Sequence, residues 1–183
     1  MKSGRRRPRE SFAERRERHA AIDDPNVVLD AAMRFLEARA RSIDEVRRRL
    51  RTAGYTSELI DGAIDRLTAL GILDDAAFAK AWVESRDRAR PRGERALRRE
   101  LQLKGIDRSV VDNVLDERRP SGGDAEAADP DATAAERLLA RHSAALARVV
   151  DPRQRRQRAY ALLARNGFDP EVAARLSASI VSD

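Results

Sequence analysis

The amino-acid sequence predicts an all-α protein, built as a tandem and elongated array of three three-helix repeats. Aromatic residues make up only 4% of the chain and charged residues 37%, so a core must consist mainly of Leu, Ile, Val and Ala, which favours helices over a sandwich or barrel. Glycine also recurs in one pattern, at Gly54, Gly105 and Gly167. We therefore expect three copies of one helical unit.

Each of these glycines has the same neighbours. A leucine stands four residues before it, a large apolar residue follows directly, and an N-cap residue comes two positions later: Leu50, Tyr55 and Thr56; Leu101, Ile106 and Asp107; Leu163, Phe168 and Asp169. This is the pattern of a helix that ends in a left-handed glycine and is followed by a newly capped helix. One further helix is expected upstream of each block, over residues 26–39, 75–89 and 133–150.

The predicted order of segments follows from these helices. It comprises a disordered basic tail (1–25), repeat 1 (26–73), repeat 2 (74–119), a linker rich in Gly, Asp and Ala (120–130) and repeat 3 (131–183). The tail holds seven arginines and few apolar residues, too few to offset the entropy of ordering. A possible capping box at Ser11 and Glu14 would still allow a short helix over residues 12–21.

Helix starts are marked by two kinds of local signal. The first kind is a capping box, found at Ser42 with Glu45 and at Thr133 with Glu136. The second is an aspartate directly before a proline, found at Asp151-Pro152 and Asp169-Pro170. Each supplies a side-chain acceptor for the free N–H groups of a first turn, and proline suits the first helical position.

Composition argues against several classes of function. The chain has no cysteine, hence no disulfide, thiolate zinc site or cysteine nucleophile. Its apolar runs are too short to span a membrane, and its first residues lack the apolar stretch of a secretory signal, so a cytoplasmic location is expected. His19 and His142 stand at no metal-ligand spacing. We therefore expect neither an enzyme nor a cofactor or metal site.

The positive charge indicates a binding function. The formal net charge is +6, almost all from arginine, whose planar fork holds carboxylate or phosphate in two-point contact. In the second helix of repeat 2, Leu97 and Leu101 should face inward, with Arg95, Arg98 and Arg99 opposite. Glu94 is the one nearby acid that can pair at helical spacing, with Arg98. Because unpaired like charges repel, this excess of arginine favours a binding face over a merely solvated one.

The predicted partner-binding set extends to neighbouring cations. It comprises Arg47, Arg48, Arg51, Arg86, Arg88, Arg90, Arg92, Arg95, Arg98, Arg99 and Lys104. For Arg47 and Arg48, ion pairs with Asp44 at helical spacing explain the charges equally well. Trp82 and Phe78, four residues apart on one helix, are expected to be core residues rather than a platform for stacking bases.

The stretch from Gly71 to Arg86 contains Leu73, Asp74-Asp75, Phe78 and Trp82-Val83, and is followed by Gly93, Glu100-Leu101 and Lys104-Gly105-Ile106. It resembles the most recognisable segment of the RecX family. A weaker likeness covers residues 28–70, and the third repeat matches only in its glycine block.

This resemblance implies a monomeric chain of three-helix repeats that lies along the groove of the RecA–DNA filament and inhibits the ATPase, strand-exchange and coprotease activities of RecA. It also allows direct contact with single- or double-stranded DNA through arginines. Two alternatives stay open. One is a helix-turn-helix regulator that reads a DNA sequence, and the other is a scaffold protein with no link to nucleic acid.

Overall fold

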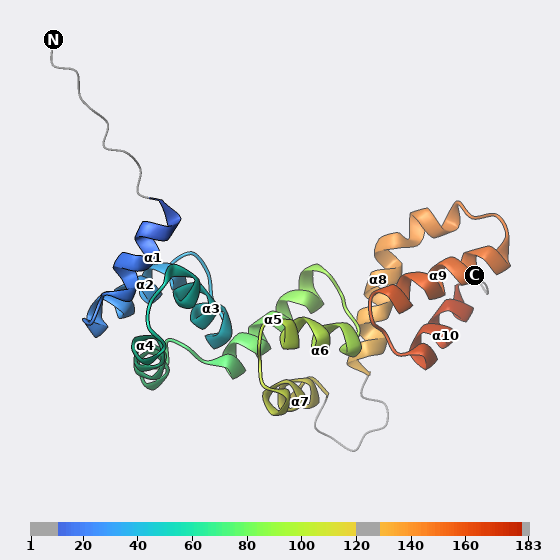
Figure 1. Ribbon diagram of the computed structural model, residues 1–183. Coiled ribbons are helices and arrows are strands. Elements are labelled where there is room, and N and C mark those ends of the chain that lie inside the picture. The colour runs from blue at the N-terminus through green and yellow to red at the C-terminus, as the bar shows by residue number, and fades with distance from the viewer. Residues whose placement is uncertain (1–10, 120–128, 181–183) are drawn as a thin grey trace, which may run out of the picture. The chain divides into compact units, whose positions relative to one another are not determined.

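A computed structural model describes residues 11–119 and 129–180, and within them the protein is all α-helical without a strand (Figure 1). The fold class predicted from the sequence is confirmed. The chain divides into two compact units, residues 1–74 and 75–183. Within the described residues three groups of three helices follow an N-terminal helix, and each group has its own apolar cluster.

The first unit contains α1 (Phe12–Ala20), α2 (Pro25–Leu36), α3 (Ile43–Ala53) and α4 (Ser57–Ala69). Helices α2, α3 and α4 pack against one another. The fully buried side chains at their centre include Val28, Val46, Leu50, Ile60 and Leu67. Together with the buried Ala32, Ala63 and Ile64 they recur three or four residues apart along each helix, as an inward stripe requires.

The second unit contains the other six helices. These are α5 (Asp75–Ala89), α6 (Glu94–Leu103), α7 (Arg108–Glu117), α8 (Pro130–Ala147), α9 (Pro152–Arg165) and α10 (Pro170–Ser179). Helices α5 and α6 both pack on α7, while α8, α9 and α10 pack on one another. Two clusters form their cores, one around Leu97, Leu101 and Val111, the other around Leu139 and Leu163.

The three predicted glycine turns are confirmed. Gly54, Gly105 and Gly167 have φ angles of 105°, 76° and 80°, in the left-handed region that favours glycine. The apolar residue after each glycine is buried, and its backbone N–H donates to the leucine carbonyl five residues earlier: Tyr55 to Leu50, Ile106 to Leu101 and Phe168 to Leu163. This bond closes the last turn of α3, α6 and α9.

Most predicted helix starts are confirmed. Ser42 and Glu45 form a complete capping box, and Asp151 and Asp169 each cap a helix that opens with proline. The predicted start at Thr133 is wrong, because α8 already begins at Pro130 with Asp129 as its N-cap. The Asp129–Pro130 pair is favoured over the capping box at Thr133 because the aspartate caps the helix and the φ angle of the proline already suits the first turn.

The predicted disorder of residues 1–25 is wrong for α1, whose short helix the sequence had only allowed. Ser11 and Glu14 form its capping box. The His19 ring stacks on Tyr55 at 4.5 Å between centroids, and its Nδ1 lies 2.8 Å from the Ala53 carbonyl oxygen. These contacts with the end of α3 anchor a helix that has no buried residue of its own. Residues 1–10 and 120–128 lie outside the described residues.

Candidate partner-binding surface

Helix α6 presents the arginine face that the sequence predicts. Leu97 and Leu101 are fully buried, whereas Arg95 and Arg99 are exposed and Arg98 is half-buried. The helix is strongly amphipathic because its apolar residues are four apart and its cations fill the positions between them. The geometry therefore places charge on the side of α6 that faces away from its core.

Two of these arginines have acidic partners that lie far away in the sequence. Arg98 is bonded to Asp112 on α7 as well as to Glu94, with 3.0 Å between Nη2 and the Glu94 carboxylate. Arg95 pairs with Asp169 at 2.8 Å. Glu94 pairs with Arg98 at helical spacing as expected, but Asp112 and Asp169 come from other helices or turns and neutralise this face further than the spacing on α6 alone indicates. Hydrogen bonds to Asp112 and Glu94 raise the pKa of Arg98, so the guanidinium is charged at any physiological pH.

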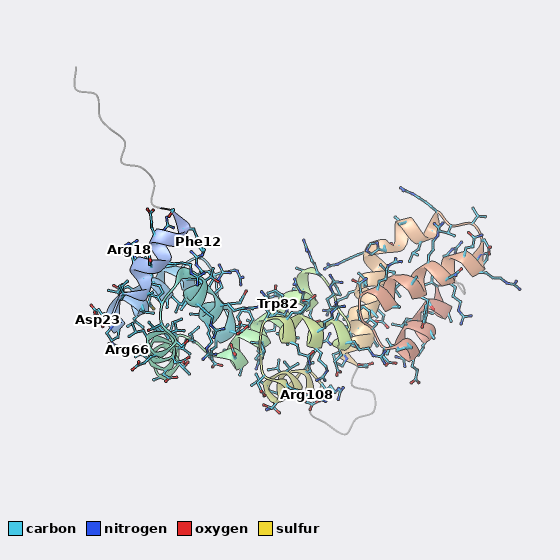
Figure 2. All side chains as sticks on the ribbon, in the orientation of Figure 1. Phe12, Arg18, Asp23, Arg66, Trp82 and Arg108 are labelled. Carbon is cyan, nitrogen blue, oxygen red and sulfur yellow. The ribbon has the colours of Figure 1, made fainter. Side chains whose placement is uncertain are left out.

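A second set of predicted cations gathers around Glu100 and Trp82, and Trp82 is labelled in Figure 2. One Glu100 oxygen accepts from Trp82 Nε1 at 2.9 Å and from Arg86 Nε at 2.6 Å. The Arg86 guanidinium carbon lies 4.3 Å from the centre of the Trp82 ring, and Lys104 Nζ lies 4.8 Å from it. The α5–α6 contact is thus a polar cluster built on one tryptophan. Trp82 is half-buried rather than enclosed in the core.

Replacing Trp82 by Ala is expected to lower the free energy of unfolding by about 2–4 kcal/mol. The value lies at the lower end of aromatic truncations because the ring is only half-buried. Trp82→Phe keeps the stacking on Phe78 at 6.0 Å and loses the bond to Glu100, so it should cost about 1 kcal/mol. Urea unfolding followed by circular dichroism measures both. Equal effects of the two variants would show that the ring does not contribute through packing.

Three arginines of the predicted set in repeat 2 have exposed side chains and no acidic partner among the described residues. They are Arg88 and Arg90 at the end of α5, and Arg99 on α6. The backbone carbonyl groups of Arg88 and Ala89 accept hydrogen bonds from Arg141 on α8. These bonds leave the Arg88 guanidinium available to a partner. Arg92 lies against Asn166, at 2.5 Å between Nη1 and the amide oxygen.

In repeat 1, the predicted cations lie on α3 in the other unit. Arg48 pairs with Asp44 at 3.1 Å, one helical turn away, as the sequence suggested. Arg47 instead pairs with Asp61 on α4 at 3.2 Å. Arg51 is exposed and has no acidic partner in the described part of the chain. The assignment of all these residues to a partner-binding surface stays a prediction.

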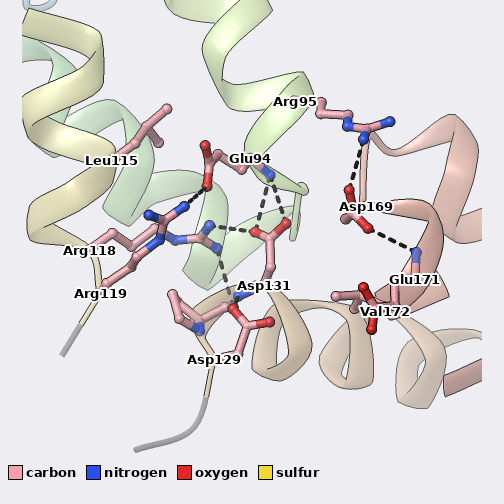
Figure 3. A pocket seen from close by; sticks show the side chains of 11 residues that line it. Glu94, Arg95, Leu115, Arg118, Arg119, Asp129, Asp131, Asp169, Glu171 and Val172 are labelled. Atoms are coloured by element: carbon pink, nitrogen blue, oxygen red, sulfur yellow. Dashed lines mark hydrogen bonds and ion pairs between the residues drawn. The ribbon is translucent and has the colours of Figure 1, made fainter. Parts of the chain in front are cut away.

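Repeats 2 and 3 meet at a buried arginine that the sequence did not single out. Arg118, which follows α7, donates from Nη2 to Asp87 at 2.7 Å. Its Nη1 donates to Asp131 at 2.7 Å, a bond drawn in Figure 3. Its side chain is only 9% exposed. Burial tends to lower the pKa of Arg118, but the two carboxylates outweigh it and raise the pKa. Burial raises the pKa of Asp131 despite its bond with Arg118.

Asp131 also caps a helix that has no capping side chain of its own. Helix α6 follows Gly93, and the backbone N–H of Glu94 donates to both Asp131 oxygens, at 3.1 and 3.0 Å. The Gly93 N–H donates to the Asn166 carbonyl at 3.0 Å. A helix terminus in repeat 2 is therefore satisfied by groups from repeat 3, which compensates for the missing side chain.

The cavity at this junction has a volume of about 390 Å³ (Figure 3). Its charged lining is largely paired within the protein. Arg119 bonds to Glu94, Arg95 to Asp169, and Arg118 to Asp131. Since acids and bases alternate around it, the cavity has no preference for an anion or a cation, and its geometry is that of a structural joint.

The described residues offer neither a metal centre nor a membrane span. Among them, no group of three or more His, Asp or Glu side chains is arranged to hold a metal ion. No helix in the described ranges is both long and apolar enough to cross a membrane.

The chain is similar to known proteins over most of its length. The family model of the first three-helix domain of RecX matches residues 29–67, and that of the second matches residues 74–115. Regulatory protein RecX of Mycobacterium ulcerans is 37% identical over 141 residues, covering 77% of both chains. Regulatory protein RecX of Mycobacterium tuberculosis is 32% identical, covering 91% of this chain and 87% of that one.

A solved structure shows the same fold. The crystal structure of RecX from Lactobacillus salivarius aligns with a TM-score of 0.67 and 22% identity, covering 88% of this chain and 99% of that one. With two matched RecX domains, and more than 30% identity over three quarters or more of its curated relatives, this chain belongs to the RecX family of regulatory proteins.

Proposed function

We propose that this protein binds RecA and the RecA–DNA filament and inhibits the ATPase, recombinase and coprotease activities of RecA. It would act as a monomeric, non-enzymatic regulator in the cytoplasm, in homologous recombination, DNA repair and the SOS response. The observation that carries this proposal is the tandem pair of RecX domains over residues 29–67 and 74–115, in a chain whose curated relatives are named regulatory protein RecX.

The proposed contact residues for such a partner are exposed arginines, on α3 in the first unit and, separately, on α6 and at the end of α5 in the second unit. Arg51, Arg88, Arg90 and Arg99 are exposed and unpaired within the described residues, so binding an acidic partner costs them no existing ion pair. Arg95 can also exchange partners, because its pair with Asp169 is 64% and 46% exposed and such pairs contribute at most about 1 kcal/mol. Arg98 is held more firmly, between two carboxylates.

Charge reversal tests this surface. Changing Arg88, Arg90 and Arg99 together to Glu is expected to weaken binding to RecA filaments by about tenfold or more, since each reversal places like charges across the contact. Fluorescence anisotropy at low and moderate salt measures the dissociation constant. The control carries Arg66, Arg108 and Arg119 changed to Glu, which alters the net charge equally outside the predicted set. If both triple variants bind equally, the site assignment is wrong.

Inhibition of ATP hydrolysis separates a filament regulator from a sequence-reading DNA protein. Cognate RecA on saturating single-stranded DNA should lose activity as this protein is added at or below stoichiometric amounts, whatever the DNA sequence. A helix-turn-helix reader should instead prefer one duplex by several kcal/mol and leave ATP turnover unchanged. The N-terminal arginines could deplete DNA as a polycation, so a full-length chain with Arg5, Arg6, Arg7 and Arg9 changed to Gln is assayed in parallel.

A further inference from the structure

Helix α9 of the third repeat holds a run of arginines with no acid among them. Between Pro152 and Phe168 the chain contains Arg153, Arg155, Arg156, Arg158 and Arg165, and neither Asp nor Glu. The predicted binding set contains no residue of this repeat. The sequence feature that could have identified this helix is the absence of acidic residues over seventeen consecutive positions, in a chain that has 31 of them.

Unlike Arg95 and Arg98 on α6, these cations are not neutralised by the fold. Arg153, Arg156, Arg158 and Arg165 are exposed, and none has an acidic partner among the described residues. Arg155 is half-buried, and its Nε donates to the Val149 carbonyl at 3.1 Å. The nearest acid in the sequence, Asp151, caps the first turn of α9 through its bond to the Arg153 N–H. These arginines therefore leave α9 with an unbalanced positive charge. Arg153 and Arg156, three residues apart, share one side of the helix and form its arginine face, whereas Arg158 lies on another side.

The position of these charges works against the helix. Arg153, Arg155 and Arg156 lie in the first turn and a half of α9, where the partial positive charge of the helix N-terminus disfavours cations. Like charges at adjacent turns also repel. Neither the helix nor its packing accounts for this arrangement, whereas a bound polyanion would remove both penalties.

The neighbouring groove indicates the class of ligand. It has a volume of about 360 Å³, and its lining includes Arg153, Arg156, Gln157, Tyr160 and Ala174. Tyr160 is 38% exposed and is the one large apolar side chain in that lining. A protein partner would be expected to meet a cluster of apolar anchors. Arginines and an amide around a single aromatic ring instead suit phosphates with a neighbouring base.

We propose that the arginine face of α9, with Tyr160 beside it, binds the phosphodiester backbone of a DNA strand. This inference extends the proposed regulation of RecA by a direct DNA contact, and its test contains no RecA, so either proposal can fail alone. Guanidinium groups bind the phosphate oxygens and release counterions. Tyr160 gives a base of a single strand a ring to stack on.

The salt dependence of binding tests this proposal on the full-length protein. The affinity for a labelled single-stranded oligothymidylate, and for a duplex of equal length, is measured between about 0.05 and 0.3 M NaCl, a range over which phosphate contacts weaken steeply. Changing Arg153 and Arg156 together to Gln should reduce the slope of log affinity against log salt by about 1.4 on the single strand, since each phosphate contact contributes about 0.7. If affinities converge at about 1 M, the loss at about 0.1 M is about 25-fold.

A matched control carries Arg66 and Arg108 changed to Gln, which removes the same charge elsewhere. The α9 variant should keep its helicity and unfold at the same or a slightly higher temperature, because cations leave a helix N-terminus. If the α9 variant loses affinity for the single strand alone, the face binds single-stranded DNA. If it loses affinity for the duplex as well, the face binds both forms of DNA. An unchanged slope, or an equal fall in the control variant, would overturn the proposal.

Discussion

Replacing Arg118 by Met is expected to lower the free energy of unfolding of the second unit by about 3–5 kcal/mol. The substitution keeps an unbranched side chain of moderate size but removes the charge between Asp87 and Asp131. Both carboxylates lie largely out of solvent, with side-chain exposures of 25% and 12%. Two nearby anions without a cation repel each other and have lost their solvation, so the cost exceeds that of an exposed ion pair.

Urea unfolding followed by the fluorescence of Trp82 measures this effect, because Trp82 is the only tryptophan of the chain and lies in the second unit. The matched control is Arg119→Met at the adjacent position. Arg119 pairs with Glu94 and Asp116, but its side chain is 57% exposed, so the variant should lose less than about 1 kcal/mol. Equal losses at the two positions would show that Arg118 contributes no more than an ordinary surface charge.

Replacing Gly167 by Ala is expected to lower the free energy of unfolding by about 3 kcal/mol or more. The φ angle of 80° costs a non-glycine residue about 1–2 kcal/mol, and the new Cβ would lie 2.4 Å from the Cβ of Ala96, an overpacking of about 1–3 kcal/mol. The opposing Gly93 is equally confined, since a Cβ there would lie 2.3 Å from both the Gly167 oxygen and the Phe168 nitrogen. Backbone atoms cannot rotate away, so repeats 2 and 3 must move apart.

Thermal unfolding measures the loss of stability, and hydrogen exchange of the Gly93 amide reports whether its bond to Asn166 is broken. Two glycines of the same chain separate the causes. Gly71 has a φ angle of 67°, and a methyl group added there would meet no atom within 4 Å, so Gly71→Ala should show the backbone cost alone. Gly62 lies within α4 with open space around it, so Gly62→Ala should stabilise the protein by about 0.5–1 kcal/mol. If Gly167→Ala costs no more than Gly71→Ala, the close contact between repeats is unimportant.

The candidate surface shows how far charge patterns can be interpreted without a structure. The outward direction of Arg95 and Arg99 follows from helical periodicity and is observed. Their pairing does not follow from it, since the acid that meets Arg95 lies 74 residues away, and Asp112, which meets Arg98, lies 14 residues away. Counting acids at helical spacing overestimated the free charge on α6. On α9 the same count finds no acid at all, and there the arginines other than Arg155 are exposed without an acidic partner among the described residues.

The class of fold, the three glycine turns and most helix starts could be predicted from the sequence, because all of these depend on residues within one or two helical turns. A left-handed glycine, a capping aspartate or an apolar stripe acts through local backbone geometry that neighbouring residues specify. The docking of α1 on α3, the capping of α6 by Asp131 and the joining of repeats 2 and 3 by Arg118 are instead visible only in the folded chain. These contacts bring together groups from separate helices, and their energies depend on distance and burial, which local sequence patterns do not encode.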